Sequence, residues 1–219
     1  TAAKKSTRKK SAAYFSRFTL TKSKRCCIIQ KLHTTFKFST QTERNGYKMI
    51  NFRKNDVILF QGDSITDGNR GRNEDLNHVM GHGYQYIAGA EIMADNIGKN
   101  VRVYNRGISG NRISDLYGRW IEDTLNLNPT VLSILIGVND ILFAYANGSG
   151  SSPERYEKIY RLLLDEALEK NPEMILIIME PFVGDNFATD KETKFFASHA
   201  KELQKSARKI AGEYNALFI

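Results

Sequence analysis

The chain of 219 residues contains little cysteine and no long hydrophobic run. Its two cysteines, Cys26 and Cys27, are adjacent, and neighbouring cysteines rarely form a disulfide with each other. The rest of the chain therefore has neither a disulfide framework nor a cysteine-based metal site, which fits a reducing compartment without requiring one. No apolar stretch approaches the roughly 18 residues that a membrane-spanning helix needs, so we expect no membrane span.

Acidic residues are almost absent from the first 48 positions. Residues 1–48 contain 13 Lys and Arg but one acid, Glu43, whereas residues 49–219 contain 19 Lys and Arg and 23 acids. The net charge of +8 therefore comes from the N-terminal segment and gives no reason to expect a nucleic-acid partner for the remainder. We divide the chain into a basic segment, 1–48, and a folded domain, 49–219.

Three interpretations of residues 1–48 remain open. The segment is rich in Lys, Arg, Ser and Thr and lacks sustained periodicity, as expected for a disordered or non-native extension that does not fold alone. A targeting segment fits loosely, and so does a basic arm for nucleic acid. We favour the extension, because Met49 stands where an α/β domain would begin. No secretory signal is recognised, so the expected location is cytoplasmic.

From Met49 onward, short apolar runs alternate with helical patterns. Such alternation predicts an α/β fold in which a parallel sheet has helices on both faces. The expected strands are residues 56–61, 101–105, 131–136, 174–179 and the opening of a fifth strand at 216–219. The expected helices are residues 84–97, 113–125, 153–170 and 190–214.

Long polar segments follow the carboxyl ends of these strands, and we expect loops at residues 62–81, 105–112, 137–152 and 180–189. Open parallel sheets bind their ligands at this edge, so we expect the working face, meaning the side that carries the functional site, to lie here. Three of the loops contain short motifs: Gly62-Asp63-Ser64-Ile65, Asn105-Arg106-Gly107-Ile108-Ser109-Gly110-Asn111, and Gly137-Val138-Asn139-Asp140.

Together, the motifs contain parts that acyl transfer by serine requires. Ser64 is a candidate nucleophile, the backbone of Gly110 can approach a substrate closely, and the Asn139 amide can donate to an oxyanion. Each residue also has a structural explanation. Ser64 could cap a helix or turn, Gly107 and Gly110 could be turn glycines, and Asn139 with Asp140 could be a capping pair. Their occurrence in order at three strand ends favours the catalytic interpretation.

The three motifs resemble the first conserved blocks of the SGNH, or GDSL, hydrolases, and the resemblance covers roughly residues 49–219. It implies a flavodoxin-like three-layer α/β/α sandwich, with Ser64 as nucleophile and an oxyanion hole from the Ser64 N–H, the Gly110 N–H and the Asn139 amide. It further implies an esterase- or lipase-like acylhydrolase acting through an acyl-serine intermediate on small acyl or carbohydrate esters, without a metal or other cofactor.

The family's fourth block, an Asp-x-x-His after the fifth strand, does not follow that strand here, because the sequence ends at Ile219. We therefore expect a C-terminally truncated chain, with the last strand and helix missing or incomplete and the general base and its orienting acid outside the chain. Such a chain should be nearly inactive. His33 lies in the basic segment and His199 within a helix, while His78 and His82 follow Ser64 without a pattern that marks either as the base.

Other polar residues near the expected working face have simpler interpretations. Asn73-Glu74-Asp75 and Asp115 are expected to be solvated or helix-capping charges, and Asp63 to accept backbone hydrogen bonds that hold its turn. A rival function is a non-catalytic carbohydrate- or ligand-binding module on the same fold. The sequence does not indicate the oligomeric state.

Overall fold

A computed structural model of the chain describes residues 43–44, 47–48, 50–72, 78–184 and 189–219. Five strands form one parallel sheet in the order β4-β3-β5-β6-β7. Their bounds are Val57–Gly62 for β3, Arg102–Asn105 for β4, Val131–Leu135 for β5, Ile175–Ile178 for β6 and Leu217–Phe218 for β7. The order confirms the expected parallel sheet, including a fifth strand that pairs with β6 over two residues.

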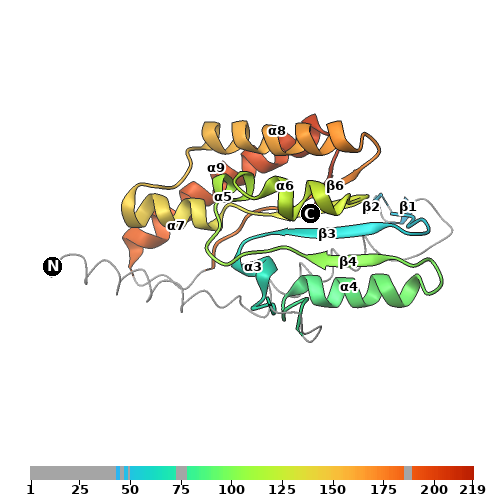
Figure 1. The fold of residues 1–219 in the computed structure, drawn as a ribbon. Coiled ribbons are helices and arrows are strands. Elements are labelled where there is room, and N and C mark those ends of the chain that lie inside the picture. Colours follow the sequence, from blue (N-terminus) through green and yellow to red (C-terminus); the bar gives the residue numbers. More distant parts are fainter. Residues whose placement is uncertain (1–42, 45–46, 49, 73–77, 185–188) are drawn as a thin grey trace.

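Helices cover both faces of the sheet and make three layers (Figure 1). One face is covered by α4, Tyr84–Asp95, and the short helix α3, Ser64–Asp67, stands at the carboxyl end of β3. The helices of the other face are α5 (Ile113–Tyr117), α6 (Trp120–Asp123), the 3-10 helix η1 (Leu125–Leu127), α7 (Val138–Asn147), α8 (Pro153–Lys170) and α9 (Asp190–Glu213). The three-layer α/β/α sandwich is thus confirmed.

The central strands β3 and β5 are buried along their whole length. Parallel strands that are covered on both faces read as continuous apolar runs, which is why both strands could be recognised in the sequence. The two layers have separate cores, one around Trp120 and Tyr160 and the other around Phe60 and Tyr84. The rigid centre of the sheet therefore presents the ends of β3, β4 and β5 side by side.

The structure overturns the expected loop at residues 137–152. Residues 138–147 form α7, which begins after Gly137 and ends at Gly148 in a left-handed conformation. Val138, Ile141 and Leu142 are buried at helical spacing, but the polar pair Asn139-Asp140 between them obscured this pattern. The expected loop at 62–81 likewise contains α3 over its residues 64–67.

The expected helix at residues 113–125 is interrupted. It divides into α5 and α6, with Gly118 ending α5 and Arg119 adopting φ −127° and ψ 14°, outside the helical range. The apolar spacing is preserved on both sides of the break, because Ile113, Leu116 and Trp120 all reach the same core. Periodicity therefore located the buried face but could not reveal the interruption.

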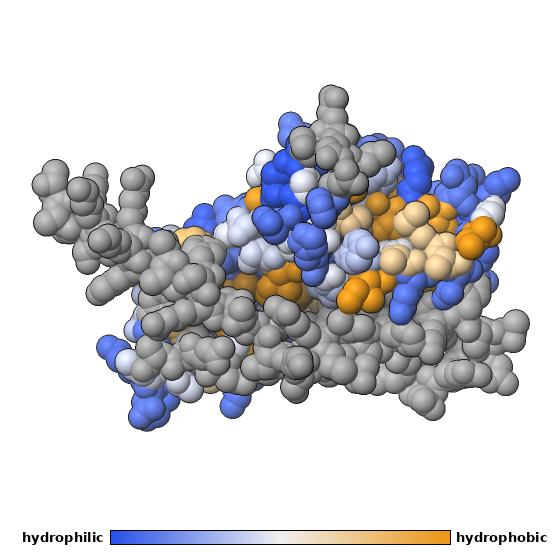
Figure 2. Space-filling view, turned by 90° about the horizontal axis from the view of Figure 1, so that it is seen from below, coloured by the Kyte–Doolittle hydropathy of each residue, from blue (hydrophilic) through white to orange (hydrophobic). Residues whose placement is uncertain are grey.

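The α4 layer has apolar side chains on its outer side as well. Tyr84, Ala88 and Ile92 are buried against the sheet, whereas Ile87 and Ile97 are exposed. Helix α4 lies at the bottom of Figure 1, and the view from below in Figure 2 shows hydrophobic residues among hydrophilic ones at the surface. None of the described helices is both long enough and apolar enough to span a membrane.

Most of the basic segment lies outside the described residues, as do His33, both cysteines and Asn73-Glu74-Asp75. Within it, the two-residue strands β1, Glu43–Arg44, and β2, Tyr47–Lys48, pair in antiparallel fashion. Ile50 belongs to the core on the α4 side, so the packed body of the protein includes residues from that position onward.

Candidate active site

Ser64 is the first residue of α3, and Asp63 alone separates it from the end of β3. Asp63 caps this helix, because its Oδ1 accepts a hydrogen bond from the backbone N–H of Ile65 at 2.9 Å, as expected from the sequence. Ser64 is partly exposed, and neither its hydroxyl nor its backbone N–H bonds to any residue that the structure describes. The cap thus belongs to Asp63, and the hydroxyl and the backbone N–H of Ser64 remain available.

The second motif packs directly against the first. The N–H of Ile108 donates to the carbonyl of Gly62 at 3.1 Å, and the N–H of Ser109 donates to Asp67 Oδ2 at 2.9 Å. Gly110 follows with φ +86°, a left-handed conformation that favours glycine. Within the described part of the chain, the Gly110 N–H donates to no acceptor. A second unpaired donor therefore stands on the loop that touches the Ser64 turn.

The third motif is attached to the second through a side-chain amide. Asn139 is buried near the start of α7, and its Nδ2 donates to the carbonyl of Asn111 at 2.9 Å. An amide nitrogen carries two hydrogens, so one remains available for another acceptor. Next to it, the Asp140 carboxylate accepts from the Ile113 N–H at 3.0 Å, which caps α5. Of this pair, Asp140 performs the capping, and Asn139 keeps one amide hydrogen available.

Two carboxyl groups behind this site are buried, and their pKa values are raised. Burial raises the pKa of Asp63 to about 7, against the hydrogen bond from Ile65 and with a smaller contribution from the nearby Asp140. Burial also raises the pKa of Asp140 to about 6, opposed by hydrogen bonds from Ile113 and Ser151. Their pKa values are raised chiefly because a buried carboxylate loses its hydration.

Stability should therefore fall as the pH rises from about 4 to about 7. Over this range the folded chain keeps protons on Asp63 and Asp140 that the unfolded chain has released, so deprotonation opposes folding. A pKa difference of one corresponds to about 1.4 kcal/mol, so we expect a decrease of a few kcal/mol in the free energy of unfolding. Urea unfolding of the wild type and of Asp63→Asn at several pH values measures this. The variant should show a shallower pH dependence, and equal slopes would contradict the prediction.

None of the described histidines forms a hydrogen bond with the Ser64 hydroxyl. His199 is exposed on α9 and stacks on Phe195, with 3.7 Å between ring centroids. His78 and His82 are both exposed, and their ring centroids are 5.2 Å apart. Asp115 pairs with Arg112 at the start of α5, as expected of a capping charge.

The spacing of the family's fourth block does occur once, at Asp75-Leu76-Asn77-His78. This occurrence lies in the first loop, whereas the family's fourth block follows the fifth strand. Asp75 is outside the described residues, and the backbone of His78 has φ +62°.

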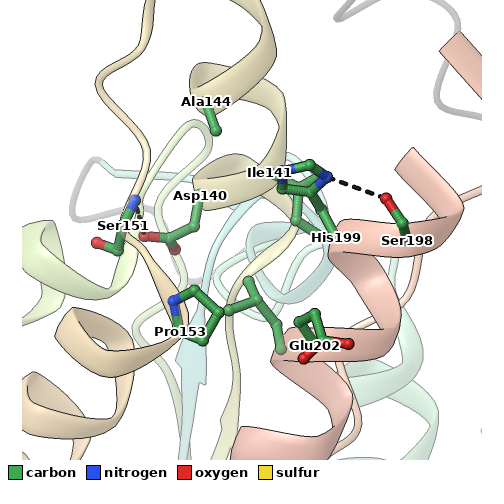
Figure 3. A pocket seen from close by; sticks show the side chains of 9 residues that line it. Asp140, Ile141, Ala144, Ser151, Pro153, Ser198, His199 and Glu202 are labelled. Carbon is green, nitrogen blue, oxygen red and sulfur yellow. Dashed lines mark hydrogen bonds between the residues drawn. The ribbon is translucent and has the colours of Figure 1, made fainter. Parts of the chain in front are cut away.

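A cavity of about 250 Å³ lies between α7, the start of α8 and α9. Figure 3 shows Asp140, Ser151 and Pro153 on one side of it and His199 and Glu202 on the other. Its lining includes neither Ser64 nor Gly110 nor Asn139, so it is separate from the candidate catalytic residues. No cluster of three or more potential metal-ligating side chains occurs in the part of the chain that the structure describes.

A parallel sheet with a partly exposed serine and unpaired donors at its carboxyl edge defines the class of hydrolases that use a serine. Comparison with known proteins then identifies the family. Residues 60–219 match the GDSL-like lipase/acylhydrolase family, and the chain belongs to it. This membership and a similar esterase make the chain a carboxylic ester hydrolase.

Similar proteins agree with this assignment. An acetylxylan esterase from Geobacillus stearothermophilus is 32% identical over 168 residues, covering 74% of each chain. A structure described as a GDSL-like lipase from Parabacteroides merdae is 39% identical with a TM-score of 0.72, covering 78% of this chain and 79% of that one. A catalytic mutant of Axe2, also an acetylxylan esterase from Geobacillus stearothermophilus, is 31% identical with a TM-score of 0.65, covering 78% of both.

Proposed function

We propose that Ser64 is the nucleophile of this ester hydrolase and that its N–H, the Gly110 N–H and the Asn139 amide form the oxyanion hole. The observation that supports the proposal most directly is that all three donors have a hydrogen unpaired by described residues, on segments that are hydrogen-bonded to one another. Asn139 is buried, and buried polar groups normally use their hydrogen bonds, so its free amide hydrogen suits a substrate oxygen. Ser64 and Gly110 are partly exposed, so a substrate can reach their N–H groups.

The reaction has two stages. Ser64 Oγ attacks the ester carbonyl carbon as its proton passes to a general base, and the three donors stabilise the negative oxygen of the tetrahedral intermediate. The intermediate collapses to an acyl-serine when the C–O bond to the alcohol breaks and the alcohol oxygen takes the proton. Water then attacks the acyl-serine in the same way, releasing the acid and restoring the Ser64 hydroxyl.

The base is proposed to be a histidine oriented by an aspartate, as the family resemblance implies. Catalytic mutants of Axe2 replace a serine, an aspartate and a histidine, and the last two are three positions apart in that protein. In the present chain, the Ser64 hydroxyl makes no hydrogen bond to any of the described histidines. Our proposal for Ser64, Gly110 and Asn139 therefore stands independently of which histidine acts.

For the substrate, we propose a short acyl ester of a carbohydrate, as the similarity to an acetylxylan esterase suggests. Release of acetate from acetylated xylo-oligosaccharides tests this directly. Acetyl esters should be hydrolysed with a higher kcat/KM than the p-nitrophenyl ester of a long-chain fatty acid. The reverse order would favour a lipid ester over a carbohydrate ester as the substrate. The assignment as an ester hydrolase would not change.

Replacing Asn139 by alanine should lower kcat by about 10²–10³-fold with a much smaller change in KM. The lost amide donor is used mainly in the transition state, where the oxygen carries full negative charge. Steady-state hydrolysis of p-nitrophenyl acetate measures the effect. Asn147→Ala, at the other end of α7, is the control and should leave kcat unchanged. A raised KM with an unchanged kcat would argue against an oxyanion role for Asn139.

A further inference from the structure

Arg119 lies against the loops of the site, although no sequence motif includes it. Its Nε donates to Asn111 Oδ1 at 2.7 Å, its Nη1 to the carbonyl of Arg106 at 2.8 Å and its Nη2 to the carbonyl of Gly62 at 3.3 Å. Nη1 also bonds to Asp123 Oδ2 at 2.9 Å. Only 12% of the side chain is exposed, so these contacts are largely shielded from water.

Three of the four acceptors belong to two different motifs, and a third motif is reached through one of them. Gly62 stands two positions before Ser64, while Arg106 and Asn111 flank the turn that contains Gly110. The carbonyl of Asn111 in turn accepts from the amide of Asn139. Arg119 is thus bonded directly to the backbone before the proposed nucleophile and to both sides of the second loop, and is one residue removed from the third.

The break between α5 and α6 gives Arg119 this position. Arg119 precedes α6 with a non-helical backbone, and Asp123 lies four residues later at the end of α6. The carbonyl of Asp123 also accepts from the side chain of Gln61, the last residue before Gly62. The ion pair of Arg119 and Asp123 is therefore itself attached to the end of β3.

Arginine is suited to this role because its guanidinium holds five N–H donors in a fixed plane. The four observed hydrogen bonds of Arg119 use all three nitrogens, and three of them end on loop atoms in separate positions. A lysine ammonium at the same site is a flexible point charge and cannot reach the same acceptors at once. This substitution would keep the positive charge but would lose hydrogen bonds that hold the loops in their positions.

We propose that Arg119 is a positioning residue, which sets the spacing between the Ser64 N–H, the Gly110 N–H and the Asn139 amide. It touches none of the reacting atoms and acts through Gly62, Arg106 and Asn111. This inference rests on the proposed function, because it assigns a role relative to that oxyanion hole. A misplacement of about 1 Å in a catalytic group typically costs about 10²-fold in rate, so a support of this kind has a measurable effect.

The simpler alternative is that Arg119 contributes only to stability, through its ion pair with Asp123. Arg161 provides a matched control, because it makes comparable forked contacts that do not involve the site loops. Its Nε donates to Glu213 at 2.8 Å and its Nη2 to Glu157 at 2.9 Å, between α8 and α9. Arg119→Lys and Arg161→Lys therefore make the same chemical change, one beneath the site and the other away from it.

The test measures binding of phenylboronic acid, which needs the oxyanion donors but no general base. The Ser64 oxygen bonds to boron, its hydroxyl proton passes to solvent, and a tetrahedral boronate anion occupies the oxyanion hole. Titration calorimetry of the full chain should show a dissociation constant raised about 10- to 100-fold by Arg119→Lys. Arg161→Lys should leave it unchanged. Thermal unfolding of both variants verifies that the protein measured is folded.

Asn111→Ala is the second variant, for use if Arg119→Lys does not fold. It removes the acceptor of the Arg119 Nε but keeps the Asn111 carbonyl that accepts from Asn139, and it should weaken boronate binding in the same direction. Unchanged affinity in a folded Arg119→Lys or Asn111→Ala protein would overturn the positioning role. Failure of the wild type to bind the boronate, or equal binding by Ser64→Ala, would instead overturn the proposed function.

Discussion

Replacing Ser64 by alanine should lower the hydrolysis of p-nitrophenyl acetate by at least about 10³-fold. The substitution removes the only atom proposed to form the acyl intermediate, whereas the Gly110 and Asn139 donors remain. The residual rate of the variant should be the rate that substrate binding and oxyanion stabilisation alone provide. Steady-state kinetics of a form of the protein that carries the histidine and the aspartate, with the uncatalysed rate subtracted, measures the loss. It is the largest effect on activity that we expect from any single substitution.

Folding of the variant is a necessary part of this test. Ser64 is partly exposed, and its hydroxyl bonds to none of the described residues, so Ser64→Ala should unfold at nearly the same temperature as the wild type. Ser198→Ala on α9 is a matched control that should keep full activity. Mass spectrometry after treatment with a fluorophosphonate should show the adduct on the wild type and on Ser198→Ala but not on Ser64→Ala. Equal hydrolysis by Ser64→Ala would assign the nucleophile elsewhere.

The parts of the fold that the sequence predicted are those determined by local pattern. β3 and β5 are buried on both faces, so their apolar runs identify them without knowledge of their neighbours. The motif at Ser64 and the cap by Asp63 follow directly from the residues after β3. The ends of adjacent parallel strands meet by geometry, so the convergence of the three loops could be expected as well.

What could not be predicted depends on contacts between distant segments. Arg119 falls inside the single helix expected over residues 113–125, and its contacts with Asn111 and Gly62 become visible only in the folded structure. The start of α7 was obscured because Asn139 and Asp140, buried for reasons of the site, are uncommon in a helix core. In both cases the prediction from local pattern failed at residues that lie beside the candidate site. Such failures are expected in functional regions.

Replacing Gly107 by alanine should cost the folded state about 3 kcal/mol or more. A Cβ at this position would overlap the backbone nitrogen of Asp67 and lie 2.7 Å from the carbonyl carbon of Thr66. Both atoms belong to the backbone of α3, so no side-chain rotation relieves the overlap, and either α3 or the second loop must move. Overpacking of a well-packed site typically costs 1–3 kcal/mol, and a contact between two backbones lies at or above the upper end.

The same displacement should damage catalysis beyond the loss of stability, because α3 begins at Ser64 and the second loop carries Gly110. Urea unfolding measures the first effect, and kcat of the folded fraction at low temperature measures the second. Gly212→Ala is the matched control: nothing lies within 4 Å of a Cβ there, and the residue is inside α9. It should stabilise the protein by roughly 0.5–1 kcal/mol, since alanine is the better helix former. Similar effects at the two glycines would mean that α3 and the second loop are not held in contact as the structure shows.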